Sequence, residues 1–204
     1  MARRRPEVRR EEILAATVAV IEHRGFAHTR VTDVADLLGI SPALVFYHFE
    51  SKEALLARAF EYAAERDLER LHVALVKGSD ATDRLRRILR LYGPQGAAGG
   101  WLLWIDAWAT ALRVPELRHT SGRLDRRWKQ AVAEVIADGV RRGEFRCDDP
   151  SGAAWRITAL IDGLAVQTTV HGAVTHRQVA AWVDRVVRAE LHPQKGTFMQ
   201  GVGW

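Results

Sequence analysis

Apolar residues recur at helical spacing along most of the chain, and the most regular run begins at Val31. Val34, Ala35 and Leu38 follow at i+3, i+4 and i+7, which is one apolar face of a short helix. Gly39 comes directly after this run. Glycine adopts the left-handed conformation of a helix stop without strain, so the pattern predicts a short helix that ends here.

A second short helix is predicted two residues later. Ser41 is a good N-cap, and Pro42 suits the first helical position because its missing N–H is not needed there. Val45 and Phe49 give this helix a narrow apolar stripe. Two short helices joined by a tight glycine turn predict a helix-turn-helix, whose second helix enters the major groove of DNA. Spacing alone supports this weakly, because any helical bundle contains such turns.

The remaining periodicity predicts an all-α chain without strands. A helix over residues 11–24, with Leu14, Val18 and Ile21 on its core face, would complete a three-helix domain. The pattern predicts further helices over 51–77, 80–92, 101–113, 115–142, from 150 through 164, and from a capping box at Thr175 and Gln178 to Pro193. The residues GPQGAAGG at 93–100 read as a flexible break, and those after Pro193 as a loose tail.

The helix-turn-helix string as a whole is far more specific than its spacing. RGF at residues 24–26, Thr29, VTDVADLLGIS at 31–41 and FYHFESKEALL at 46–56 follow in this order. From about residue 13 to residue 56, this string resembles the N-terminal DNA-binding domain of the tetracycline-repressor (TetR) family of bacterial regulators. The resemblance implies a DNA-binding regulator.

In that family the reading helix and the start of the preceding helix touch DNA. Lys52 places a positive charge at a helix start, where only phosphate attraction justifies it against the helix dipole. Ala43 and Leu44 cannot hydrogen-bond bases, so they would read thymine methyl groups and DNA shape. The alternative is that Phe46 and Leu44 are core residues. The resemblance implies phosphate contacts from Ser41, Phe46, Tyr47, His48 and Lys52, base-edge contacts from Thr32, Pro42, Ala43 and Leu44, and Arg30 in the same interface.

The C-terminal half is similar to the branch of this family that includes the choline-responsive repressors. The tryptophans from Trp101 to Trp128, the RGEF turn at 142–145 and Asp162-Gly163-Leu164 carry this similarity. Aromatic walls with a few polar groups suit a small ligand, and tryptophan faces also favour a cation. We expect an effector site lined by Phe60, Tyr92, Trp101, Trp104, Ile105, Trp108, Trp128 and Gln167, with Asp106 as a second candidate polar group. A bulky core is the alternative, and it is preferred for Trp155 and Trp182.

The last two predicted helices carry apolar residues on more than one face. Such an excess predicts a four-helix interface between two copies of the chain. The expected interface residues are Ile157, Leu160, Ile161, Leu164, Val179, Trp182, Val183 and Val186.

Composition narrows the class of protein. The net charge is +5, and the first ten residues hold five arginines against one glutamate, so a basic arm is concentrated at the N-terminus. Cys147 is the only cysteine, which excludes an internal disulfide and fits a reducing cytosol. The most apolar window, 101–114, is too short to span a membrane. The eight histidines lack metal-ligand spacing and no catalytic motif appears, so we expect no metal, no cofactor and no enzymatic activity.

These features together predict an all-α protein. An N-terminal arm and helix-turn-helix domain (1–50) would be continuous with a six-helix ligand-binding and dimerisation bundle (51–192), followed by a flexible tail (193–204). The expected function is a cytoplasmic, homodimeric regulator that leaves a palindromic DNA operator when a small hydrophobic or cationic effector binds. The alternative is a helical small-molecule-binding or catalytic bundle that does not bind DNA. A membrane-surface protein is a poorer third option, since the basic arm is short.

Overall fold

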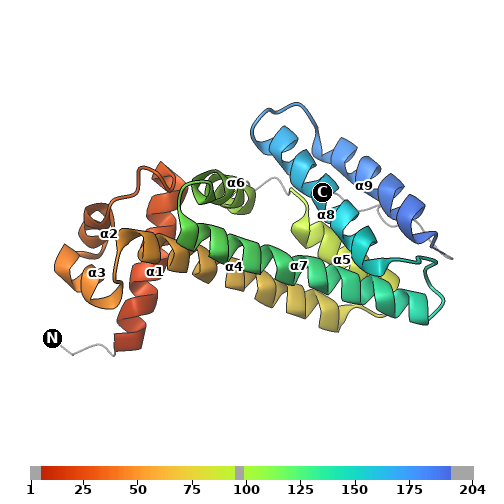
Figure 1. Cartoon of the computed structure of the whole chain (residues 1–204), viewed down its shortest axis with the longest axis horizontal. Helices are drawn as coiled ribbons and strands as arrows, with labels where there is room; N and C mark the ends of the chain where they lie inside the picture. Colours follow the sequence, from red (N-terminus) through yellow and green to blue (C-terminus); the bar gives the residue numbers. More distant parts are fainter. Residues whose placement is uncertain (1–5, 95–98, 194–204) are drawn as a thin grey trace. The chain divides into compact units, whose positions relative to one another are not determined.

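The computed structural model describes residues 6–94 and 99–193, and these residues form helices and no strand (Figure 1). The predicted all-α fold is confirmed. The basic arm before Pro6, residues 95–98 of the glycine break and the tail after Pro193 lie outside the described residues, and the break's last two glycines begin α6. The helices are α1 (Pro6–Arg24), α2 (Val31–Leu38), α3 (Pro42–His48), α4 (Lys52–Lys77), α5 (Ala81–Tyr92), α6 (Gly99–Ala111), α7 (Pro115–Arg141), α8 (Pro150–Thr169) and α9 (His176–Leu191).

The helix boundaries follow the sequence signals to within a few residues, and α1 shows the clearest difference. Helix α1 begins at Pro6, before the predicted start at Glu11. Proline is well placed in a first helical turn, and Arg9 pairs with Glu12 at 3.0 Å one turn later. Charged residues therefore extend a helix whose apolar pattern begins only at Ile13.

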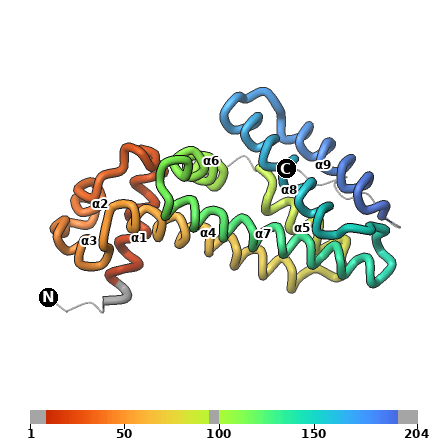
Figure 2. The backbone as a smooth tube through the Cα atoms, in the orientation of Figure 1, coloured from red at the N-terminus to blue at the C-terminus, as the bar shows by residue number. Residues whose placement is uncertain are grey.

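Two compact units can be distinguished, each with its own core. The first combines residues up to Asp67 with Leu102–Leu124, and the second combines Leu68–Trp101 with the residues from Asp125 onward. Figure 2 follows the backbone from α1 through the two short helices into α4, and α4 and α7 each contribute residues to both units. The boundary at residue 50, between the DNA-binding domain and the ligand-binding bundle, stays a prediction.

The first unit is built around the predicted apolar faces of the short helices. Val34 and Ala35 of α2 are fully buried, and Val45 and Phe49 are nearly so. On α1, Leu14 and Ile21 are buried as expected, whereas Val18 is only half-buried. Fully buried residues that complete this core are Ile13, Phe26, Ala59 and Phe60.

The second unit is fixed by well-capped helices. The predicted capping box forms at the start of α9, where the Thr175 hydroxyl accepts from the Gln178 N–H and the Gln178 amide oxygen accepts from the Thr175 N–H. The Glu144 carboxylate accepts from the backbone N–H groups of Ala81 and Thr82 at 3.2 and 2.9 Å, and so caps α5 from 62 residues away. The RGEF turn thus has a structural role.

Part of the predicted dimer interface on α8 and α9 is wrong, because half of its residues are buried within the chain. Four of its eight residues are fully buried within the single chain, so they belong to the core between α8 and α9: Ile157, Ile161, Val179 and Val183. Leu164 is nearly buried as well, at 7 % exposure. The predicted residues with outward area are Leu160, Trp182 and Val186. Trp155 and Trp182, which we expected in the core, are 53 % and 40 % exposed.

The described residues also bear on membrane insertion and metal binding. No helix among them is both long and apolar enough to cross a membrane. Within the same residues, no three side chains of the metal-binding types gather into a group.

Candidate nucleic-acid interface

The turn between α1 and α2 is held by local hydrogen bonds. Gly25 ends α1 with a φ of 77°, which is a left-handed conformation that favours glycine. The Thr29 hydroxyl donates to the Gly25 carbonyl at 2.8 Å. At the start of α2, the Asp33 carboxylate accepts from the Arg30 N–H at 3.1 Å. These contacts fix the entry of the chain into α2, where Arg30 and Thr32 are exposed.

The turn between α2 and α3 has the geometry that the sequence predicted. Gly39 lies at φ 61° and ψ 40°, and the Ile40 N–H donates back to the Ala35 carbonyl at 3.0 Å. Ser41 is the N-cap of α3, and its hydroxyl accepts from the Leu44 N–H at 3.3 Å. Because Val45 and Phe49 face inward, the other sides of α3 are left for a partner.

All ten predicted DNA-binding residues lie on the surface of the first unit. Arg30, Thr32, Ser41, Pro42, Ala43, Phe46 and Tyr47 are exposed, and Leu44, His48 and Lys52 are half-buried. Phe46 is 49 % exposed and Tyr47 is 81 % exposed, so the alternative of Phe46 as a core residue is wrong. The Tyr47 and His48 rings meet edge to face with centroids 5.2 Å apart. Phe46 and Tyr47 therefore place two aromatic side chains on this face without contributing to the core.

One arginine of the predicted basic arm lies against the end of α3. The guanidinium of Arg10, in α1, lies 5.1 Å from the centroid of the Phe49 ring at the end of α3. Helical spacing alone could not have placed it there, because the contact joins positions 39 residues apart. Lys52, in the first turn of α4, adds a second cation close to this end of α3 in the sequence.

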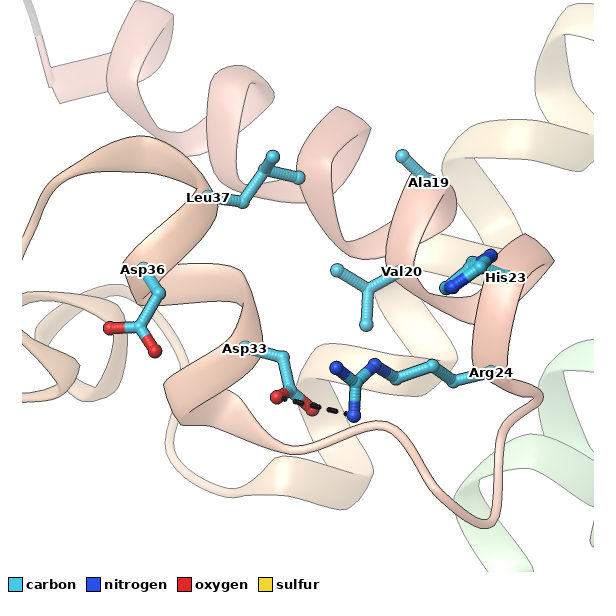
Figure 3. A pocket seen from close by; sticks show the side chains of 7 residues that line it. All are labelled: Ala19, Val20, His23, Arg24, Asp33, Asp36 and Leu37. Carbon is cyan, nitrogen blue, oxygen red and sulfur yellow. Dashed lines mark ion pairs between the residues drawn. The ribbon is translucent and has the colours of Figure 1, made fainter.

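The space between α1 and α2 has a different character. An open groove of about 400 Å3 lies between α1 and α2, with Val20 and Leu37 pointing into it (Figure 3). Arg24 and Asp33 form an ion pair at 3.6 Å along its edge. Asp36 adds a second carboxylate to this groove, which makes it unfavourable for phosphate. The lining residues are Ala19, Val20, His23, Arg24, Asp33, Asp36 and Leu37.

The aromatic residues expected at the effector site form ring contacts within each unit. In the first unit, the Trp104 ring meets the rings of Phe60 and Trp108, with centroids 4.8 and 5.9 Å apart. In the second unit, the Tyr92 ring meets Trp101 at 5.8 Å and Trp128 at 5.3 Å.

The other two residues expected at the effector site are not aromatic. Ile105 is half-buried in the first unit, and Gln167 is exposed in the second. Leu112 lies beyond the end of α6 and is 70 % exposed. The effector site itself stays a prediction.

The half-buried carboxylate of Asp162 lies beside the rings of Tyr92, Trp101 and Trp128, and no sequence pattern indicated this contact. The Tyr92 hydroxyl donates to Oδ1 of Asp162 at 2.7 Å. Burial, together with the charge of Asp125, raises the pKa of Asp162 to about 6, although the Tyr92 hydrogen bond and Lys129 act in the opposite direction. Burial and the Asp162 charge also raise the pKa of Tyr92 well above its usual value.

Comparisons with known proteins agree with this geometry. Residues 13–59 match the family described as bacterial regulatory proteins, tetR family, and residues 81–192 match the BetI-type transcriptional repressor C-terminal family. The chain is 28% identical over 158 residues to the HTH-type transcriptional regulator CymR of Pseudomonas putida, covering 77% of each protein. It is 23% identical over 177 residues to the HTH-type transcriptional regulator BetI of Yersinia pestis (strain Pestoides F), covering 85% of this chain and 87% of that one.

A solved structure extends the comparison. A protein from Saccharomonospora viridis, determined in complex with choline, has a TM-score of 0.77 and 29% sequence identity. The match covers 91% of this chain and 98% of the other. These relatives are named as regulators, which confirms the prediction of a non-enzymatic protein. The chain is therefore a helix-turn-helix transcriptional regulator that belongs to the TetR family, with a C-terminal half of the BetI type.

Proposed function

We propose that this regulator is a homodimeric repressor whose two α3 helices enter successive major grooves of a palindromic operator. The observation that carries the proposal is the exposure of Tyr47, at 81 %, beside Phe46 on a helix of only seven residues. Large aromatic side chains outside the core have no role in folding this unit. With Lys52 and Arg30 nearby in the sequence, they suit contacts with DNA phosphates and base edges.

The outward faces of α8 and α9 support the homodimer. A Cβ atom on Gly163, within α8, would meet no atom within 4 Å. Glycine inside a helix costs about 1 kcal/mol relative to alanine, and nothing inside the chain accounts for it at this position. A second helix approaching closely would account for it, with Leu160, Trp182 and Val186 supplying apolar area around it.

We further propose that the effector is a small hydrophobic or cationic molecule bound by the region 51–192. The rings around Tyr92 offer aromatic faces, and Asp162 offers a negative charge beside them. The choline found in the Saccharomonospora viridis protein supports this class of ligand. Because α4 is one continuous helix, a shift in the second unit would be felt in the first. A DNA-binding repressor of this kind would work in the cytoplasm.

Selection from random duplexes tests the DNA-binding proposal. We expect enrichment of a palindrome whose half-sites lie about one or more helical turns apart, roughly 34–36 Å. Affinity should fall steeply with salt as counterions are recaptured. Enrichment of no sequence at moderate salt would favour the alternative, a helical bundle that does not bind DNA.

Tryptophan fluorescence with choline as the probe tests the effector proposal separately. Choline should quench the emission and weaken binding to the selected duplex, and the duplex should weaken choline binding by the same factor. If the protein binds DNA but not choline, the proposal of a DNA-binding repressor stands and the proposed class of effector is wrong.

A further inference from the structure

A hydrogen bond within the first unit joins α6 to the turn between α1 and α2. Oδ2 of Asp106 accepts a hydrogen bond of 2.7 Å from the backbone N–H of Phe26, which lies 80 residues earlier in the chain. This is the distance of a charge-assisted hydrogen bond, which is among the stronger polar contacts in proteins. Asp106 was expected as a polar group of the effector site, and this contact gives its carboxylate a different role.

Gly25 makes room for this carboxylate. A Cβ atom at this position would lie 3.0 Å from Oδ2 of Asp106, which is tighter than ordinary contact. The glycine is also held at a φ of 77°. The missing side chain leaves room for Asp106 at the Phe26 N–H, and the left-handed backbone favours glycine at position 25.

The side chain of Phe26 is connected to α6 indirectly, through Phe60 of α4. The Phe26 ring is fully buried and meets the Phe60 ring edge to face at 6.1 Å. Phe60 in turn meets Trp104 at 4.8 Å. Residues 104 and 106 are two positions apart on α6 and so leave it in different directions, yet both connect to Phe26. A movement of α6 would therefore move Phe26.

We propose that Asp106 is a positioning residue through which α6 sets the DNA-reading geometry of α2 and α3. The chain from Gly25 to Arg30 is short and internally bonded by Thr29, so a displacement of Phe26 passes to the start of α2. The proposal deepens the repressor function proposed above and rests on it. In this scheme an effector that moves α6 acts on the operator through this hydrogen bond.

Hydrogen exchange of the full-length protein tests the contact without DNA or effector. Asp106→Ala should speed amide exchange in peptides that cover residues 25–30 by about tenfold. Asp106→Asn should restore protection, because the amide oxygen can still accept from the Phe26 N–H. Glu65→Ala removes an exposed carboxylate from the same unit and should leave exchange unchanged. Equal exchange in wild type and Asp106→Ala would overturn the proposal.

The ratio of specific to random DNA binding tests the consequence. For Asp106→Ala, affinity for the selected duplex should fall about tenfold, while affinity for random duplex, which depends on phosphates, changes by less than about twofold. A purely structural role would lower thermal stability without changing this ratio. Loss of both affinities in proportion, or of neither, would refute the positioning role. If the wild type enriches no duplex sequence, the proposed repressor function is wrong. Hydrogen exchange still tests whether Asp106 holds the backbone at Phe26.

Discussion

The hydroxyl of Tyr92 donates a 2.7 Å hydrogen bond to Oδ1 of Asp162 and thereby joins α5 to α8. Because burial raises the pKa of Asp162 from 3.8 to about 6, the folded chain holds this proton more tightly than the unfolded chain. The stability that Asp162 contributes is therefore complete below about pH 4, declines as the pH rises through 6, and is lost above it.

Asp162→Asn should remove this pH dependence, because the amide stays neutral and its oxygen still accepts from Tyr92. From pH 4 to pH 8, the free energy of unfolding of the variant should rise relative to wild type by up to about 3 kcal/mol. Urea unfolding at several pH values measures the difference. Asp148→Asn, an exposed change in the same unit, controls for the loss of charge. A constant difference over this range would mean that burial does not raise the pKa of Asp162.

Gly139→Ala should destabilise the second unit. A Cβ atom on Gly139 would lie 2.2 Å from Cδ2 of Phe145, and the Phe145 ring is only 2 % exposed and cannot move away easily. Overpacking of this kind costs about 1–3 kcal/mol. Thermal unfolding measures it, with Gly100→Ala, where a Cβ atom meets nothing within 4 Å, as the matched control. Equal stability of the two variants would contradict the close packing of the Phe145 ring against Gly139.

Tyr47→Ala and Leu37→Ala form a pair that separates DNA binding from folding. Both side chains are large, apolar and exposed, at 81 % and 60 %, so each change should alter stability by less than about 0.5 kcal/mol. Only Tyr47 lies on the proposed DNA face, whereas Leu37 points into the groove between α1 and α2. Fluorescence anisotropy should show weaker operator binding for Tyr47→Ala alone, and equal affinities would argue against the proposed face.

Gly163→Leu should prevent dimerisation while leaving the chain folded. A Cβ atom at this exposed position meets no atom of its own chain within 4 Å, so we expect the leucine side chain to clash with a second copy and not with its own chain. Sedimentation should give about twice the 22.9 kDa chain mass for the wild type and the single-chain mass for this variant. Glu134→Leu, at an exposed position on α7, should remain dimeric. A dimeric Gly163→Leu protein would place the interface elsewhere.

Local signals predicted the reading helices well, because each depends on residues near it in the sequence. The Gly39 stop, the Ser41 cap and the inward pair Val45 and Phe49 are all decided within one or two helical turns. The same applies to the capping box of α9. The sequence could therefore predict both that these helices form and which of their faces is buried.

Contacts between distant segments could not be predicted in this way. Asp106 looked like a polar group for a ligand, but it bonds a backbone N–H that no side-chain pattern reveals. Trp155 looked like a core residue, yet its ring is half exposed and receives the Lys129 ammonium at 4.4 Å. Helical periodicity identifies an apolar face without saying whether the same chain covers it.

The composition of the first unit from two stretches of chain has a consequence for protein engineering. A graft of residues 1–50 onto another regulator would leave behind Phe60, which supports the Phe26 ring, and Asp106, which holds its backbone. The transplanted helices would then depend on whatever the recipient offers at these places. The portable DNA-reading module is discontinuous, so exchange of operator specificity requires residues 102–124 to travel with the N-terminal segment through Asp67.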